Sequence, residues 1–210
     1  MTIETPLIKA DHSQLLRLKS YFPLDPLSRH SVGYYFYPEK SDYEAGFRPY
    51  KAFSRQEAGF IVKTFQSLSD RLPLSFKSTR DVVTGIRFSR VSSFPGAKKL
   101  LGTTSTLLQP VAANSPEVDL DASSVWIKLR LDGNSQVSRL ERSTIVHEIG
   151  HALGLSHPND KPNSSKYTDD DTIMSYRPGL NGRSTWFSSV DMQALEEIWC
   201  ATSSSGLPLA

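Results

Sequence analysis

The stretch HEIGHALGLSH, residues 147–157, constrains the chain more than any other part of the sequence. It holds three of the five histidines within eleven positions, with a glutamate directly after the first of them. His147 and His151 are four residues apart, so on a helix their side chains lie one turn apart on the same face. Two imidazole nitrogens placed in this way can reach one zinc ion at roughly 2.0–2.1 Å.

The other fixed positions of the stretch extend this zinc site. Glu148 is rotated by about 100° from His147 around the helix, which keeps it near the metal without making it a ligand. Gly154 is the expected helix end, because glycine adopts the left-handed conformation that closes a helix. The chain can then turn back and bring His157 to the metal as a third ligand. Three neutral ligands leave the charge of the ion to activate water, so the pattern indicates metal-assisted hydrolysis. The alternative, a chance gathering of core histidines, does not explain why glutamate and glycine stand at matching positions.

Capping patterns and hydrophobic periodicity place this stretch in an α+β domain. Ser54 with Glu57, and Ser138 with Glu141, form capping boxes that predict helices over 54–70 and from 139 toward the glycine at 154. A last helix is expected after the FSS sequence at 187–189. Aromatic-rich or alternating apolar segments predict strands before and between these helices. The segments with this pattern are 32–38, 74–76, 84–91 and 123–131.

Composition bounds the class of protein. The chain has 210 residues, of which 38% are apolar and 22% charged, as is typical of one globular domain. The net charge is +2 and Lys98–Lys99 is the only conspicuous basic pair, which argues against nucleic acid as a partner. No apolar run has the length of a membrane span or a signal peptide, so we expect no membrane association. We expect a monomer, exported by a route without an N-terminal signal, with the cytoplasm as the alternative location.

The chain contains one cysteine, Cys200, so no internal disulfide can form. A thiol can in principle occupy a zinc site and keep an enzyme latent. Its place at the end of the final predicted helix favours a half-buried structural thiol instead.

The full stretch resembles the extended zinc motif of the metzincin metallopeptidases, H-E-x-x-H-x-x-G-x-x-H. A second mark of that family is a methionine-containing turn, and TIMSY supplies it at Met174, seventeen residues after His157. Within the metzincins the chain is most similar to serralysins, over roughly residues 120 to 200. The resemblance implies a zincin-like fold: a twisted mixed sheet with a backing helix and an active-site helix, then a small C-terminal subdomain with the Met turn and a final helix.

The resemblance also implies roles for individual residues. Glu148 matches the general base that activates water and passes a proton to the leaving amine. Tyr176 matches a tyrosine that ligates zinc in the resting enzyme and then stabilises the oxyanion. The methionine of the turn matches an apolar floor beneath the metal. The zinc ligands themselves match His147, His151 and His157.

We expect three regions along the chain: an N-terminal extension over 1–30 that could cover the cleft, an upper subdomain over 31–154, and a lower subdomain over 155–210. No two glycines are adjacent, so the glycine-rich calcium repeats usual in serralysins are not expected. The three acids at 169–171 are interpreted as a solvated loop rather than a calcium site. Segment 102–108, GTTSTLL, is the candidate edge strand that would hold an extended substrate peptide.

These observations predict a zinc-dependent endopeptidase that acts on protein or peptide substrates. One alternative is a zinc-containing module that captures peptides or an inhibitor without turnover. The intact Glu148 argues against it, because a binding module needs no general base. Another alternative is a toxin or processing protease of narrow specificity, which the sequence does not separate from a broad protease.

Overall fold

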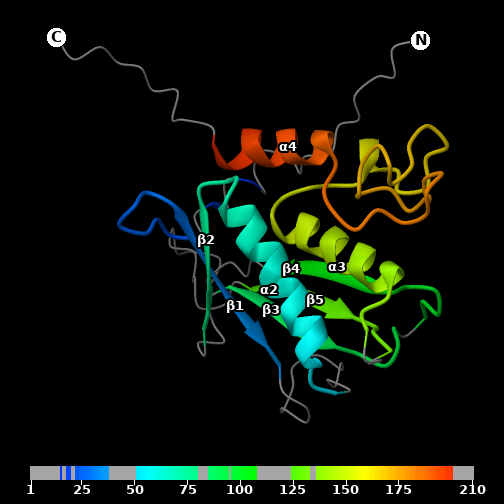
Figure 1. The fold of residues 1–210 in the computed structure, drawn as a ribbon, viewed down its shortest axis with the longest axis horizontal. Helices are drawn as coiled ribbons and strands as arrows, with labels where there is room; N and C mark the ends of the chain where they lie inside the picture. The colour runs from blue at the N-terminus through cyan, green and yellow to red at the C-terminus, as the bar shows by residue number, and fades with distance from the viewer. Residues whose placement is uncertain are drawn as a thin grey trace, which may run out of the picture.

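The computed structural model describes residues 15, 18, 19, 22–37, 51–79, 85–94, 96–107, 124–132 and 136–200. Regular structure alternates between strands and helices along most of this part of the chain (Figure 1). The elements, in chain order, are β1 (His30–Phe36), α2 (Arg55–Ser69), β2 (Leu74–Ser78), β3 (Ile86–Arg90), β4 (Gly102–Leu107), β5 (Ser124–Leu129), α3 (Arg139–Ala152), the short 3-10 helix η2 (Pro158–Asp160) and α4 (Ser189–Trp199).

The five strands form one mixed sheet in the order β2-β1-β3-β5-β4. Strands β2, β1, β3 and β5 run parallel, whereas β4 pairs antiparallel with β5 and stands at the sheet edge. The α+β class and the mixed sheet expected from the sequence are therefore confirmed. The predicted edge strand over 102–108 is β4, apart from its last residue, which lies outside the described residues.

Helices α2 and α3 pack beside each other on one face of the sheet (Figure 1). Both helices begin with the predicted capping boxes, at Ser54 and Ser138. Helix α2 covers the β2 side of the sheet, where Phe65 stacks on Phe76 with ring centroids 4.3 Å apart. Helix α3 covers β4 and β5 at the other side. Helix α3, which carries His147 and His151, therefore lies directly against the edge strand.

Helix α4 lies across the end of α3 and closes the core there (Figure 1). The indole of Trp199 donates a hydrogen bond of 3.1 Å to the carbonyl oxygen of Leu153, at the C-terminus of α3. Two residues of the N-terminal segment, Leu18 and Phe22, belong to the same buried core, and the Phe22 ring lies 6.1 Å from that of Trp199. Leu18 and Phe22 therefore belong to the part of the core that α4 closes.

Cys200 corrects one expectation from the sequence. It is exposed rather than half-buried. The residue is the C-cap of α4, one position after the buried Trp199. Successive helical side chains point about 100° apart, so Cys200 leaves the packed side of the helix.

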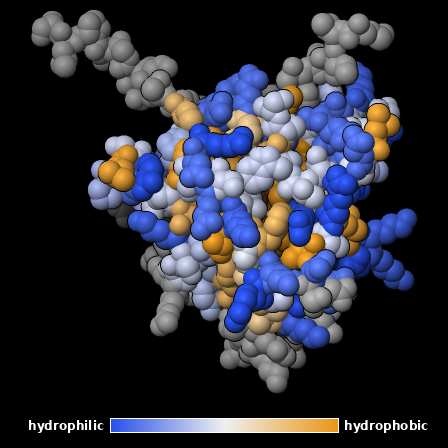
Figure 2. Space-filling model, in the orientation of Figure 1, coloured by the Kyte–Doolittle hydropathy of each residue, from blue (hydrophilic) through white to orange (hydrophobic). Residues whose placement is uncertain are grey.

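The face of the molecule that carries α2 and α3 is mostly hydrophilic, with small scattered apolar patches (Figure 2). No helix in the described ranges has the length and apolar character needed to cross a membrane.

A buried carboxylate joins α4 to the turn that contains Met174. Asp191 is fully buried and accepts hydrogen bonds from the amide nitrogens of Ile173, at 2.9 Å, and Ser188, at 2.8 Å. It also accepts from the hydroxyl of Thr172. One side chain therefore caps α4 and orients the methionine turn.

We predict that Asp191→Ala lowers the free energy of unfolding by about 2–4 kcal/mol, because it leaves several buried donors without an acceptor. Urea unfolding monitored by tryptophan fluorescence measures this. Glu196→Ala, at an exposed position of the same helix, is the control and should change the free energy of unfolding by less than about 0.5 kcal/mol. Equal stability of the two variants would contradict the assigned role of Asp191.

Candidate metal centre

The histidine stretch folds as the C-terminal half of α3 and the turn that follows it. Gly154 has φ of +99°, as its predicted place after the helix requires. The amide of Leu155 bonds to the carbonyl oxygen of Gly150 at 2.9 Å, and the amide of Gly154 bonds to that of His151 at 3.0 Å. These two bonds form a Schellman motif, which reverses the chain just after the second histidine.

This reversal brings the three imidazoles together. One ring nitrogen from each of the three histidines lies within 4.8 Å of those of the others. The Nε2 atoms of His151 and His157 are 3.3 Å apart. Two ligand atoms of a tetrahedral zinc ion, each at roughly 2.0–2.1 Å, lie about 3.3–3.4 Å apart, so this spacing fits zinc. Within the described part of the chain, His147, His151 and His157 are the one group of three or more such side chains arranged to hold a metal ion.

The second nitrogen of two of these rings is held by the backbone. Nδ1 of His147 lies 2.8 Å from the carbonyl oxygen of Ile173, and Nδ1 of His151 lies 2.9 Å from that of Leu155. A carbonyl only accepts, so each Nδ1 carries the proton and each Nε2 presents a lone pair. Nε2 of His147 is buried and has no hydrogen-bond partner. A metal ion would satisfy this orphaned atom, and the residues present therefore fit zinc.

The surroundings also keep the rings neutral. Burial, reinforced by the His151 ring, holds the pKa of His147 well below its usual range. Burial lowers the pKa of His151 to about 4, with His157 acting in the same direction. Burial likewise lowers the pKa of His157. Neutral imidazole is the form that binds a metal.

Glu148 follows the first histidine and turns toward β4 rather than toward the three nitrogens. Its side chain is buried, and its Oε2 atom accepts a hydrogen bond of 2.7 Å from the hydroxyl of Thr104. Burial raises the pKa of Glu148 to about 7, and the Thr104 hydrogen bond opposes this rise. The group is therefore a carboxyl suited to accept and release a proton.

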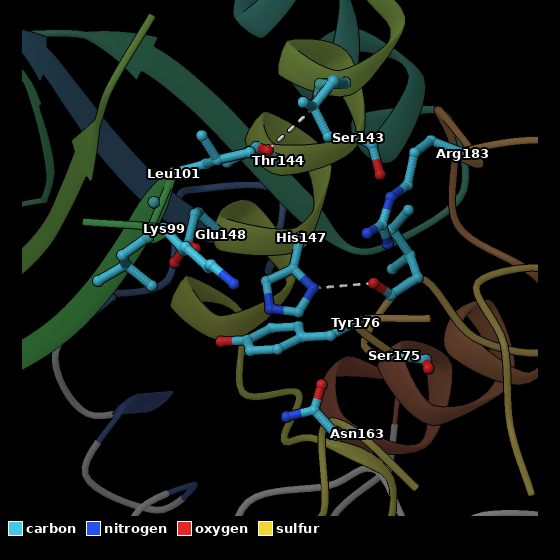
Figure 3. A pocket seen from close by; sticks show the side chains of 14 residues that line it. Lys99, Leu101, Ser143, Thr144, His147, Glu148, Asn163, Ser175, Tyr176 and Arg183 are labelled. Carbon is cyan, nitrogen blue, oxygen red and sulfur yellow. Dashed lines mark hydrogen bonds between the residues drawn. The ribbon is translucent and has the colours of Figure 1, made fainter. Parts of the chain in front are cut away.

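Tyr176 lies beside the histidines. Its ring centroid is 5.4 Å from that of His147 and 5.0 Å from that of His157. Figure 3 shows the tyrosine ring next to His147, with its hydroxyl on the side where Glu148 lies. Burial, reinforced by the charge of Glu148, raises the pKa of Tyr176. The residue as a whole is 39% exposed, so part of it reaches solvent.

Met174 is fully buried and lies against α3. A Cβ atom added at Gly150 would lie 2.8 Å from the methionine sulfur. The turn can approach the helix this closely only because Gly150, directly before His151, has no side chain. The carbonyl that holds His147 comes from the residue before Met174, so this close packing positions the first imidazole.

The acidic run before the methionine turn corrects a second expectation. Asp169 is 1% exposed, so it is not part of a solvated loop. Its carboxylate accepts hydrogen bonds from the amides of Gly179, at 2.6 Å, and Ser184, at 3.2 Å, and lies 3.5 Å from a guanidinium nitrogen of Arg183. This segment has no regular strands, so side chains accept the hydrogen bonds of its backbone amides. Asp169 is buried because it is one of these acceptors. Asp170 is exposed, and its neighbour Asp171 accepts from the amide of Thr168 at 2.8 Å.

A pocket of about 370 Å³ opens next to the histidines. Its lining includes His147, Glu148 and Tyr176, together with apolar walls and the cationic groups of Lys99 and Arg183 (Figure 3). The apolar part of the lining comes from Leu100, Leu101, Leu140 and Ile173. His147, one of the three candidate metal ligands, forms part of its wall.

The sequence singles out the histidines, Glu148, Met174 and Tyr176 as candidate site residues, but it does not single out Thr104, which donates a hydrogen bond to Glu148. Segment 102–108 was singled out as an edge strand, and nothing in its own pattern indicates which side chain meets Glu148. The two residues are 44 positions apart, and only the packing of α3 on β4 brings them together. The cation of Arg183 in the pocket was missed for the same reason.

Three relatives match parts of the chain. Metalloendoproteinase 1-MMP of Arabidopsis thaliana is 32% identical over 103 residues, which are 47% of this chain and 28% of that protein. Probable matrix metalloproteinase 095L of Invertebrate iridescent virus 3 is 34% identical over 93 residues, 42% of this chain and 24% of that protein. Serralysin A of Dickeya chrysanthemi is 36% identical over 63 residues, 26% of this chain and 13% of that protein. The chain therefore spans less than a third of the length of each relative.

Among solved structures, two of myroilysin resemble this fold. The first is 15% identical with a TM-score of 0.43, and the match covers 82% of this chain and 92% of that one. The second is 14% identical with a TM-score of 0.42, and the match covers 81% of this chain and 82% of that one.

The resemblance to metzincins is thus supported by named metalloproteinases, while the closer likeness to serralysins stays a prediction. The profile of the matrixin peptidases matches residues 40–172, which is more than half of the chain and includes all three histidines. The chain belongs to the matrixin family.

Proposed function

We propose that the protein is a zinc-dependent endopeptidase that hydrolyses protein or peptide substrates. One observation carries this proposal: three neutral imidazoles converge on one point, with a buried Nε2 that has no partner, beside a carboxyl whose pKa is raised to about 7. Membership of the matrixin family supports it. The rival reading, a zinc-containing module that binds peptides without turnover, gives no reason for a carboxyl at this place.

Each residue has a proposed part in the reaction. His147, His151 and His157 would hold zinc, which when bound supplies a Lewis acid that polarises the scissile carbonyl and activates water. Glu148 accepts the proton of the attacking water and passes it to the leaving amine nitrogen, so the proton is returned within one turnover. Tyr176 donates a hydrogen bond to the oxygen on which negative charge develops.

The proposed substrate path runs along the edge of the sheet. Strand β4 has no strand on its outer side in the described sheet, so its main chain is free to pair with an extended peptide. The cleft would then separate an upper subdomain over 31–154 from a lower one over 155–210. The lower part contributes His157 and Tyr176, and the upper part contributes the other two histidines and Glu148.

We predict that Glu148→Gln lowers peptide hydrolysis at least about 100-fold while one zinc ion per chain is retained, because the side chain moves a proton without ligating the metal. Hydrolysis of a denatured protein mixture and atomic-absorption analysis of zinc are the measurements. Glu196→Gln, an exposed change on α4, is the matched control and should behave like the parent. A Glu148→Gln protein with more than a few per cent of parental activity would refute the proposed mechanism.

Tyr176→Phe is expected to lower kcat by about 10–100-fold and to change KM by less than about threefold, since the hydroxyl would act mainly on the transition state. Steady-state kinetics on a peptide identified from the digest measures both constants. Tyr35→Phe removes a hydroxyl on β1, whose residues do not line the pocket, and serves as the control. If Tyr176→Phe and the control have the same kcat, the tyrosine only packs against the histidines.

The turn at Gly154 is predicted to control zinc binding without supplying a ligand. Gly154→Val introduces a β-branched residue at φ of +99°, and its Cβ would meet Leu15 at 2.6 Å. We expect loss of zinc under mild chelation and protease cleavage within 158–171, as for His157→Ala. Gly96→Val changes another positive-φ glycine that has open space around it, and it should keep zinc. Retention of zinc by Gly154→Val would contradict the turn's role.

A further inference from the structure

We propose that strand β4 positions the general base: Thr104 holds the Glu148 carboxylate by a hydrogen bond, and Gly102 leaves the space that the carboxylate occupies. Thr104 is a positioning residue rather than a catalytic one, because its contact is with the carboxylate and not with the metal site. The proposal rests on the proposed endopeptidase function and adds to it the residues that orient Glu148.

The first contact is direct. The Thr104 hydroxyl lies 2.7 Å from Oε2 of Glu148 and 3.0 Å from the main-chain oxygen of the same residue. The shorter distance is that of a well-formed O–H···O hydrogen bond. Glu148 is 4% exposed, so water has little access to replace this donor. Within the described part of the chain, the side chain that donates a hydrogen bond to this carboxylate is that of Thr104.

The second contact is steric. A Cβ atom at position 102 would lie 2.6 Å from Oε1 and 2.7 Å from Cγ of Glu148. Any side chain there would press on the Glu148 side chain and on the Thr144 methyl group, which would lie 2.8 Å away, so the bare backbone of Gly102 leaves the space that the carboxylate occupies. One carboxylate oxygen is therefore held by a hydrogen bond and the other lies against a glycine. Together the two contacts favour one orientation of the group.

The sheet places both contacts on the same side of the strand. Residues 102 and 104 are two positions apart, so they point to the same face of β4, the face on which α3 packs. They pair in register with Leu129 and Ile127 of β5, whose side chains are buried in the core. Strand β4 is also the edge proposed to align the substrate main chain. One rigid strand would thus place the peptide and the base relative to each other.

This placement matters because proton transfer depends strongly on distance. A general base works within about 2.6–3.2 Å of the proton it accepts, and a shift of about 1 Å can cost roughly 100-fold in rate. A buried glutamate without fixed partners has several rotamers available. The hydrogen bond and the space at Gly102 would select the productive one before substrate binds.

The kinetic test uses Thr104→Val, which keeps the shape of the side chain and removes the hydroxyl, and Thr104→Ser, which keeps the hydroxyl. We expect Thr104→Val to lower kcat by roughly 10–100-fold, with KM within about threefold of the parent and zinc content unchanged. Thr104→Ser should stay within about threefold of the parental kcat. Gly102→Ala should reproduce the loss in kcat with zinc retained, since it displaces the same carboxylate.

Thr64→Val is the matched control. Thr64 is a buried threonine of α2 whose hydroxyl donates a hydrogen bond of 3.0 Å to Phe60, away from the histidines. Its replacement removes a comparable bond and should leave kcat unchanged. If Thr104→Val and Thr64→Val have the same kcat, or if Thr104→Ser loses as much activity as Thr104→Val, the positioning role is refuted.

A second readout does not depend on activity. In zinc-free protein, Thr104→Val should lower the thermal midpoint by a few degrees when Glu148 is present. It should cause a clearly smaller loss in a Glu148→Ala background, because the carboxylate is gone and only the main-chain oxygen of residue 148 is left as an acceptor. Equal losses in both backgrounds would overturn the contact. A parent protein that binds zinc but hydrolyses no peptide would instead refute the proposed function, while this thermal cycle would still measure the contact.

Discussion

The hydrogen bonds from two imidazoles to two backbone carbonyls hold the candidate metal centre together. His151 donates to Leu155, in the turn that ends its own helix, and His147 donates to Ile173, in the methionine turn. Each bond fixes a ring orientation and leaves Nε2 as the lone-pair donor, the arrangement that second-shell partners provide in metalloproteins. A shift in either turn would rotate a ligand, so the orientation of these two histidines depends on loop backbone rather than on the sheet.

The remainder of the lower region keeps these two carbonyls in place. Asp191 accepts a hydrogen bond from the amide of Ile173 and caps α4, so the position of the methionine turn depends on a helix residue eighteen positions further along the chain. The missing side chain at Gly150 lets Met174 lie against α3. Packing and buried hydrogen bonds therefore act together on the carbonyl that orients His147. The buried Nε2 of His147 has no hydrogen-bond partner, which is costly, and a bound cation would relieve that cost.

Local sequence patterns predicted much of this arrangement, because the interactions involved are short-range. The capping serines Ser54 and Ser138 mark the starts of two helices, and each box closes within three residues. His147 and His151 lie on the same face of the helix because they are four residues, about one helical turn, apart. The positive φ of Gly154 depends only on how that helix ends. The burial of Asp169 and the exposure of Cys200 were predicted wrongly, since burial depends on which elements meet and not on local spacing.

By itself, the amino-acid sequence determined the helix, its end at Gly154 and the set of candidate ligands, all through contacts between residues close along the chain. The tertiary structure alone decided which backbone carbonyls orient the rings and which side chains surround Glu148. Thr104 meets that glutamate across 44 residues because α3 packs on β4 and β4 pairs antiparallel with β5. Register and packing arise from the whole core, and no short pattern encodes them.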